Sequence, residues 1–156
     1  MDAIKQNQIE PEKSARRRCM RLLAQATVEE MRAVLHAILP TPEIFAVRGP
    51  ETGLVMVRGR IGGGGDPFNL GEATVTRATI RMETGEIGHG QMLGTDKEKA
   101  RLAAVFDALW QKPERRAVVE ALVLAVEERI AAQDRLEAEQ TAATRVDFFT
   151  MVRGEN

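Results

Sequence analysis

Apolar residues recur with helical spacing at the start of the chain. Residues 1–10 are polar, and we expect them to form a mobile N-terminus. Pro11 then opens a helix with one apolar stripe, which is formed by Cys19, Leu22, Leu23 and Ala26. Thr27 and Glu30 have the spacing of a capping box. A second helix is therefore predicted to begin at Thr27 and to end at Pro40.

Two further helical patterns follow Thr95. Thr95 and Glu98 again have capping-box spacing, and the stripe behind them comprises Leu102, Val105, Phe106 and Leu109. Pro113 suits the first turn of a last helix, whose apolar face comprises Val119, Leu122, Val123, Val126 and Ile130. Beyond Ile130 the pattern becomes polar. A helix that continues to about Gln140 would be roughly 40 Å long at 1.5 Å per residue, so its end is expected to project.

Between the helical patterns, apolar and polar residues alternate as in β-strands. Strands are predicted over residues 44–48, 53–61, 72–83 and 86–93. In the third of these, the apolar positions change face near Thr76 and Arg77, which predicts a bulge or a break. The short connections favour antiparallel pairing. We therefore predict an α+β fold with an antiparallel sheet of three to four strands, two N-terminal and two C-terminal helices, and a single domain over residues 11–144.

The composition excludes several classes of protein. A chain of 156 residues with 44% hydrophobic residues can bury one core. Its 29% charged residues and net charge of −1 argue against a nucleic-acid binder. No stretch approaches the ~20 apolar residues of a membrane span, and the first residues lack the apolar segment of a secretory signal. The single cysteine cannot form an internal disulfide, which is consistent with a cytoplasmic protein. Together, these features predict a cytoplasmic chain that binds neither nucleic acid nor membranes.

Residues for covalent catalysis are few. The chain has one serine (Ser14), one cysteine (Cys19), two histidines (His36 and His89) and no tyrosine. Ser14 and Cys19 lie in the arginine-rich first helix, where a surface or core position explains them better than catalysis. His36 lies off the apolar stripe of its helix, and no second histidine or cysteine is placed to share a metal with His89. We expect no catalytic residue, metal site or cofactor in this chain.

A run of four glycines, Gly62–Gly65, allows two interpretations. The Walker A pattern requires Gly-Lys-Ser/Thr, but Asp66, Pro67 and Phe68 follow the glycines, so a tight turn between strands is favoured. Arginines flank the loop on the predicted strands and could bind phosphate; the candidates are Arg58, Arg60 and Arg77, with Arg81 nearby. The alternative is a solvated sheet face, which we favour.

Gly88 and Gly90 leave one face of the last strand bare. Such a surface usually marks the close approach of another backbone. That backbone is either a helix of this chain or a partner chain.

A basic cluster in the first helix comprises Arg16, Arg17, Arg18 and Arg21. The neutral net charge and the lack of interleaved aromatic residues argue against nucleic-acid binding. A solvated helix face is the favoured interpretation.

The last twelve residues, 145–156, are apolar for a chain terminus. They include two of the five phenylalanines, together with Val146, Met151 and Val152. Aromatic residues, methionine and arginine are enriched at the cores of protein interfaces. We therefore favour a partner-binding tail over one that packs back on its own domain, with candidate contacts at Arg145, Asp147, Phe148, Phe149, Met151 and Arg153.

The segment Arg145–Gly154, RVDFFTMVRG, resembles the closing signature of the PhnG family, the G subunits of the bacterial carbon–phosphorus (C–P) lyase system. Further agreement lies at 51–55, 60–63, 71–78, 85–88 and 93–97, so the resemblance covers roughly residues 17–156. Thr95 and Lys99 depart from the family pattern, in which arginine and histidine often stand at these positions. No role is carried over to either.

The resemblance implies a subunit of the C–P lyase core complex with subunits H, I and J. With H, I and the ATP-binding subunit L, it would support the attack of a phosphonate on ATP, which displaces adenine and gives ribose 1-phosphonate 5-triphosphate. The complex, not this chain, would act on ATP and phosphonate, and this chain would have a structural role. The alternative is a free-standing regulatory domain that binds phosphate or another anion.

Overall fold

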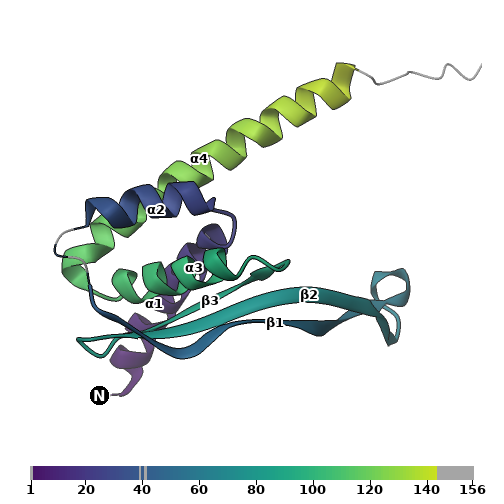
Figure 1. The fold of residues 1–156 in the computed structure, drawn as a ribbon. Coiled ribbons are helices and arrows are strands. Elements are labelled where there is room, and N and C mark those ends of the chain that lie inside the picture. Colours follow the sequence, from purple (N-terminus) through teal and green to yellow (C-terminus); the bar gives the residue numbers. More distant parts are fainter. Residues whose placement is uncertain (1, 39, 41, 144–156) are drawn as a thin grey trace, which may run out of the picture.

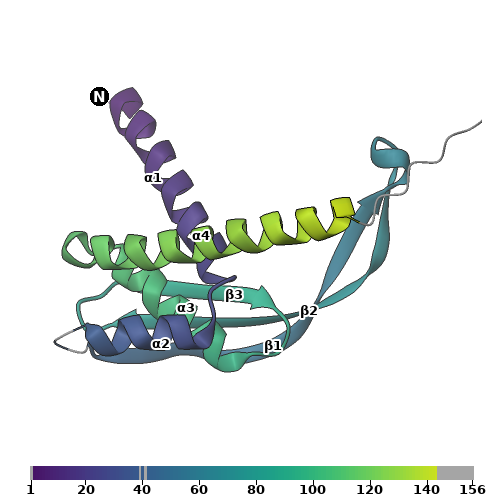
Figure 2. The same cartoon turned by 90° about the horizontal axis from the view of Figure 1, so that it is seen from above.

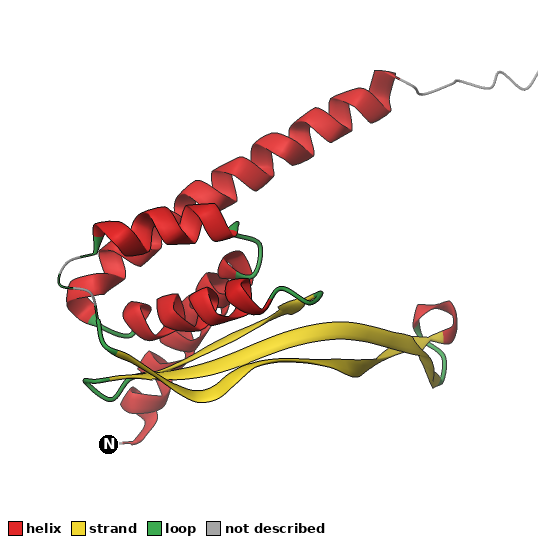
Figure 3. Ribbon diagram, viewed as in Figure 1, coloured by secondary structure: helices red, strands yellow, loops and turns green. Residues whose placement is uncertain are grey.

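The fold is a three-stranded antiparallel sheet with helices packed on one face (Figures 1 and 3). The structure, a computed structural model, describes residues 2–38, 40 and 42–143. In chain order the elements are α1 (Asp2–Leu23), α2 (Val28–Ala37), β1 (Ile44–Arg60), the short 3₁₀ turn η1 (Ile61–Gly63), β2 (Pro67–Met82), β3 (Ile87–Leu93), α3 (Lys97–Trp110) and α4 (Pro113–Ala143). The strand order is β1-β2-β3. The predicted α+β fold is confirmed.

Two helix starts differ from the prediction. α1 begins at Asp2, well before Pro11, which lies inside the helix and does not begin it. The mobility of residues 1–10 stays a prediction. The N-cap of α3 is Asp96, whose carboxylate accepts from the N–H of Lys99 at 2.8 Å, and the predicted Thr95 is not the cap. The capping box of α2 is confirmed, because Thr27 and Glu30 each accept from the other's backbone N–H.

β1 is one long strand where the sequence predicted two. Gly49 and Pro50 do not end it; the β1–β2 pairing passes from Arg48 opposite Thr79 to Glu51 opposite Arg77, with an irregularity between them. A bulge accommodates the extra residues, and it tolerates proline because one ladder hydrogen bond is already lost there. The sheet therefore has three strands, within the predicted range.

A bulge does lie beside Arg77, but in β1 and not in β2 where it was predicted. The β1–β2 register shifts between the pairs Arg48–Thr79 and Glu51–Arg77, whereas Thr76 and Arg77 keep regular pairing with β3. The helix-facing positions of β2 continue through Thr76, which is fully buried; its hydroxyl donates to the carbonyl of Gly94 at 2.7 Å and lies 2.9 Å from the hydroxyl of Thr52. A satisfied buried threonine thus occupies the position where the apolar pattern had broken.

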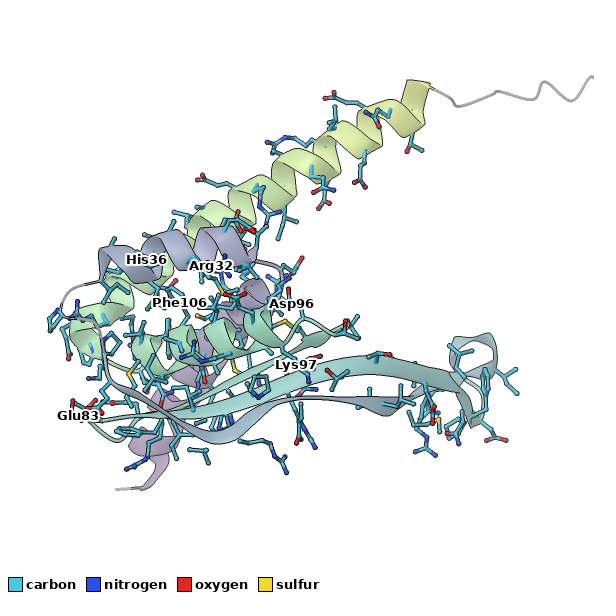
Figure 4. All side chains as sticks on the ribbon, in the orientation of Figure 1. Arg32, His36, Glu83, Asp96, Lys97 and Phe106 are labelled. Carbon is cyan, nitrogen blue, oxygen red and sulfur yellow. The ribbon has the colours of Figure 1, made fainter. Side chains whose placement is uncertain are left out.

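α3 is the centre of the core. Every residue from Leu102 to Trp110 is buried, and Figure 4 shows Phe106 between the other helices and the sheet. The predicted stripes of α3 and α4 are also buried, except that Ile130 is only partly covered.

α3 lies directly on the bare glycine face of β3. A Cβ built on Gly88 would lie 2.7 Å from the backbone nitrogen of Ala108, and one built on Gly90 would lie 2.8 Å from that of Ala104. The close backbone predicted for this face is therefore an internal helix and not a partner chain.

Two parts of the molecule extend beyond the core on the same side. The β1–β2 hairpin continues past the end of β3, and α4 runs on past Ile130 as an exposed, mostly polar helix (Figures 1 and 2). The predicted projection of the last helix is confirmed. We call residues 53–74 of the hairpin the arm.

Candidate functional site

The three arginines proposed for phosphate do not share one surface. Arg77 lies near the base of the arm, where its Nε donates to the Oε1 of Glu51 at 2.6 Å. Arg58 lies opposite Asn69, seven residues further along β1 than Glu51, which is about 23 Å at 3.3 Å per residue. Arg60 is at the tip, where its Nη1 donates to the carbonyl of Gly65 at 3.2 Å. Phosphate binding by these arginines stays a prediction.

The glycine run closes the arm as a tight turn, as the favoured interpretation predicted. Gly62 and Gly63 have φ angles of 57° and 80°, in the left-handed region where glycine is strongly preferred. The N–H of Gly65 donates to the carbonyl of Ile61 at 2.8 Å. These glycines meet the geometric needs of a hairpin tip.

Sequence reasoning missed the exposed apolar surface of the arm. Its large apolar side chains are between 37% and 68% exposed, and they are Leu54, Val55, Met56, Val57, Ile61, Phe68 and Leu70. The signal was present as an uninterrupted Leu-Val-Met-Val run, residues 54–57. Such a run, without alternation, is typical of a strand covered on both faces. Here neither face is covered by the residues that the structure describes.

A buried carboxylate joins three elements behind the sheet. Asp107 of α3 is fully buried and accepts from Arg16 of α1 through Nε (2.9 Å) and Nη2 (2.8 Å). It also accepts from the backbone N–H of His89 in β3 at 2.9 Å. The hydrogen bonds to Asp107 raise the pKa of the Arg16 guanidinium. Because every acceptor bond of Asp107 serves the fold, we assign the group a structural role.

The prediction of a solvated face for the basic cluster of α1 is confirmed for Arg17 and Arg21, which are exposed, and is wrong for Arg16 and Arg18, which pair with other helices. Besides Arg16, Arg18 donates to Glu127 at 2.5 Å and to Glu120 at 3.2 Å, and both carboxylates lie on α4. Arg21 lies 3.9 Å from Glu127. Spacing within one helix could not reveal partners that are about a hundred residues away.

The nucleophile candidates lie apart from any acid–base pair. Cys19 is fully buried, and burial raises the pKa of its thiol to about 12, so the thiol stays protonated at neutral pH. Ser14 and His36 are exposed on α1 and α2 (Figure 4 labels His36). His89 lies on the open face of the sheet, where its Nδ1 is 3.2 Å from the hydroxyl of Thr79.

Within the described ranges, no group of three or more His, Cys, Asp and Glu side chains could hold a metal ion. The same part of the chain contains no helix long and apolar enough to cross a membrane. The absence of a metal or cofactor in the working protein stays a prediction.

A pocket of about 310 Å³ lies between α1 and the α3–α4 turn. It is lined by Glu12, Lys13, Arg16, Trp110, Gln111 and Arg116. The Arg116 guanidinium stacks over the Trp110 ring at 4.2 Å and pairs with Glu12 at 3.1 Å, while Arg16 is held by Asp107. These cations already have partners in the fold, so the pocket is a poor anion site.

The predicted partner-binding residues of the tail, Arg145, Asp147, Phe148, Phe149, Met151 and Arg153, lie outside the described residues. What the structure adds is their attachment point. The tail follows α4, whose last described residue is Ala143. Partner binding by the tail stays a prediction.

Comparisons with known proteins agree with the resemblance seen in the sequence. Residues 14–154 match the family described as "Phosphonate metabolism protein PhnG". A protein of Rhizobium meliloti (strain 1021), the alpha-D-ribose 1-methylphosphonate 5-triphosphate synthase subunit PhnG, is 68% identical over 141 residues, which cover 90% of each chain. Almost the whole chain is thus matched, and it belongs to the PhnG family.

Proposed function

We propose that this chain is the G subunit of an α-D-ribose 1-methylphosphonate 5-triphosphate synthase in the C–P lyase system. One observation carries the proposal: the 68% identity to a named synthase subunit extends over 90% of both chains. The family match over residues 14–154 includes the sheet, helices α2 to α4 and part of α1. The chain therefore acts with partner subunits in phosphonate metabolism.

We further propose that the chain supports the reaction without carrying its catalytic groups. In that reaction, a phosphonate oxygen would form the new bond to ATP as adenine leaves, giving ribose 1-phosphonate 5-triphosphate. Such a step needs groups that hold a triphosphate and protonate a leaving base. Among the described residues, the buried carboxylate of Asp107 is engaged in the fold and the Cys19 thiol is inert. These observations favour a structural role.

Subunits H, I and J are the proposed partners, and subunit L is the proposed ATP-binding subunit.

The test is co-expression of the full chain with H, I and J, followed by capture through a tag on one of those subunits. The full chain is expected to co-purify in stoichiometric amount. A chain that ends at residue 144 should co-purify less, because it lacks the proposed anchor over residues 145–156. Recovery of H, I and J without the full chain would contradict the proposal.

The alternative of a free-standing anion-binding regulator gains no support. Of its candidate arginines, Arg58 and Arg60 lie on the arm, whereas Arg77 lies outside it and is paired with Glu51. The relative at 68% identity is named as a synthase subunit.

A further inference from the structure

The arm is a two-stranded ribbon that no other described part of the chain covers. β3 ends at Leu93, opposite Val75, so β2 has only β1 as a neighbour beyond that point. An isolated two-stranded hairpin is marginally stable in water and usually needs a third strand or a covering layer. Neither is supplied by the described part of this chain.

Both faces of the arm are apolar. Successive residues of a strand point to opposite faces, so Leu54 and Met56 share one face while Val55 and Val57 share the other. All four side chains are at least 37% exposed. Contiguous exposed apolar surface of this kind marks an interaction site.

Between its irregularities at 48–51 and 57–58, the outer edge of β1 is also free of any other described strand. Proteins usually guard a free strand edge with charges, proline or a short strand. Residues 53–57, Gly-Leu-Val-Met-Val, contain neither a charge nor a proline, and they lie within a 17-residue strand. This edge is suited to accept an extended segment through main-chain hydrogen bonds.

We propose that the arm is a docking element for a different subunit of the synthase, which pairs an extended segment with the β1 edge at residues 53–57 and covers both apolar faces. This inference rests on the proposed function, since it requires that the chain be a synthase subunit. It deepens that function by assigning the contact to named residues.

Two observations favour a different subunit over a second copy of this chain. First, a ribbon that is apolar on both faces cannot be enclosed by one other ribbon, because an arm laid against an arm leaves the outer face of each exposed. Second, the arm and the free end of α4 extend to the same side of the body (Figures 1 and 2). Residues 144–156, with their five large apolar residues, continue the chain from that end of α4. A larger partner on this side can contact the arm and the described end of α4 together.

The test compares two substitutions of equal exposure in the full chain. Met56→Lys places a charge on the arm, and Leu124→Lys places one on α4; the two side chains are 53% and 52% exposed. Both variants should fold and melt within about 2 °C of the unsubstituted chain, because exposed substitutions seldom change stability by more than about 0.5 kcal/mol. In binding to the co-expressed synthase subunits, Met56→Lys should lose about tenfold or more in affinity, and Leu124→Lys less than about twofold.

Hydrogen exchange supplies a second measurement on the unsubstituted complex. Amides of residues 54–57 should exchange about tenfold or more slowly in the complex than in the free chain. Binding of Met56→Lys as tight as that of the unsubstituted chain, or unchanged exchange at 54–57, would overturn the docking role while leaving subunit membership intact. Equal loss of binding by both variants would overturn its location on the arm.

Light scattering of the free chain tests whether a second copy of this chain, instead of a different subunit, covers the arm. A stable dimer that Met56→Lys dissociates would replace the different subunit by a second copy and so overturn the proposal; a monomer supports it. If the unsubstituted chain binds none of the synthase subunits, the proposed function itself is contradicted, and the docking role falls with it.

Discussion

Gly90→Ala should destabilise the protein more than any surface change, because it forces a methyl group into the β3–α3 contact. The new Cβ would overlap the carbonyl oxygen of Ala100 and lie 2.8 Å from the nitrogen of Ala104. Carbon–oxygen contacts are normally about 3.3 Å or longer, so α3 would have to move by roughly 1 Å. α3 is buried from Leu102 to Trp110 and has no free side toward which to move.

Overpacking of this kind costs about 1–3 kcal/mol, and the backbone atoms in the contact argue for the upper end. A loss of ~3 kcal/mol lowers the melting temperature of a domain of this size by about 6–12 °C. The assay is thermal unfolding followed by circular dichroism, with urea unfolding to obtain the free energy.

Gly71→Ala is the matched control. Gly71 is also a strand glycine, but a Cβ built there meets no atom within 4 Å. This variant should melt within about 2 °C of the unsubstituted protein. If Gly90→Ala melts as high as Gly71→Ala, the assigned packing of α3 on β3 is refuted.

Three further predictions concern the core and its caps. Asp107→Ala should lower the free energy of unfolding by about 3 kcal/mol in urea titrations, because it leaves the partly exposed Arg16 and the backbone N–H of His89 without their acceptor. Arg32→Ala, which removes an exposed ion pair, should change the free energy of unfolding much less. Thr27→Ala should cost about 1 kcal/mol by the same measurement, through loss of the α2 cap. Cys19 should resist alkylation in the native state and react in urea. Because its folded pKa is raised to about 12, the unfolded chain ionises first above about pH 8.5, and the free energy of unfolding should fall as pH rises from there toward 12; a flat dependence across that window would contradict the burial.

The periodic elements could be predicted from the sequence because each depends on local spacing. The capping box at Thr27 and Glu30 and the stripe of α4 follow from residues three or four apart, and both are as predicted. The family could be identified for a similar reason, since Arg145–Gly154 is a contiguous signature.

What could not be predicted depends on contacts between distant segments. The sequence pattern predicts a surface position for Arg16, because its partner Asp107 is ninety-one residues away in the chain. Thr76 interrupts the apolar pattern, and the sequence alone does not show the hydrogen bond to the Gly94 carbonyl that lets its hydroxyl be buried. The arm's exposure follows from where β3 stops, and no single strand pattern shows that.

Adenine release from ATP and methylphosphonate by reconstituted subunits tests the central claim most directly. Three mixtures are compared: the full chain with subunits H, I and L; the full chain alone; and subunits H, I and L without it. If the chain is a required but non-catalytic subunit, adenine should form only in the complete mixture, and the chain alone should release none. Release by the isolated chain, or an undiminished rate when the chain is left out, would contradict the account.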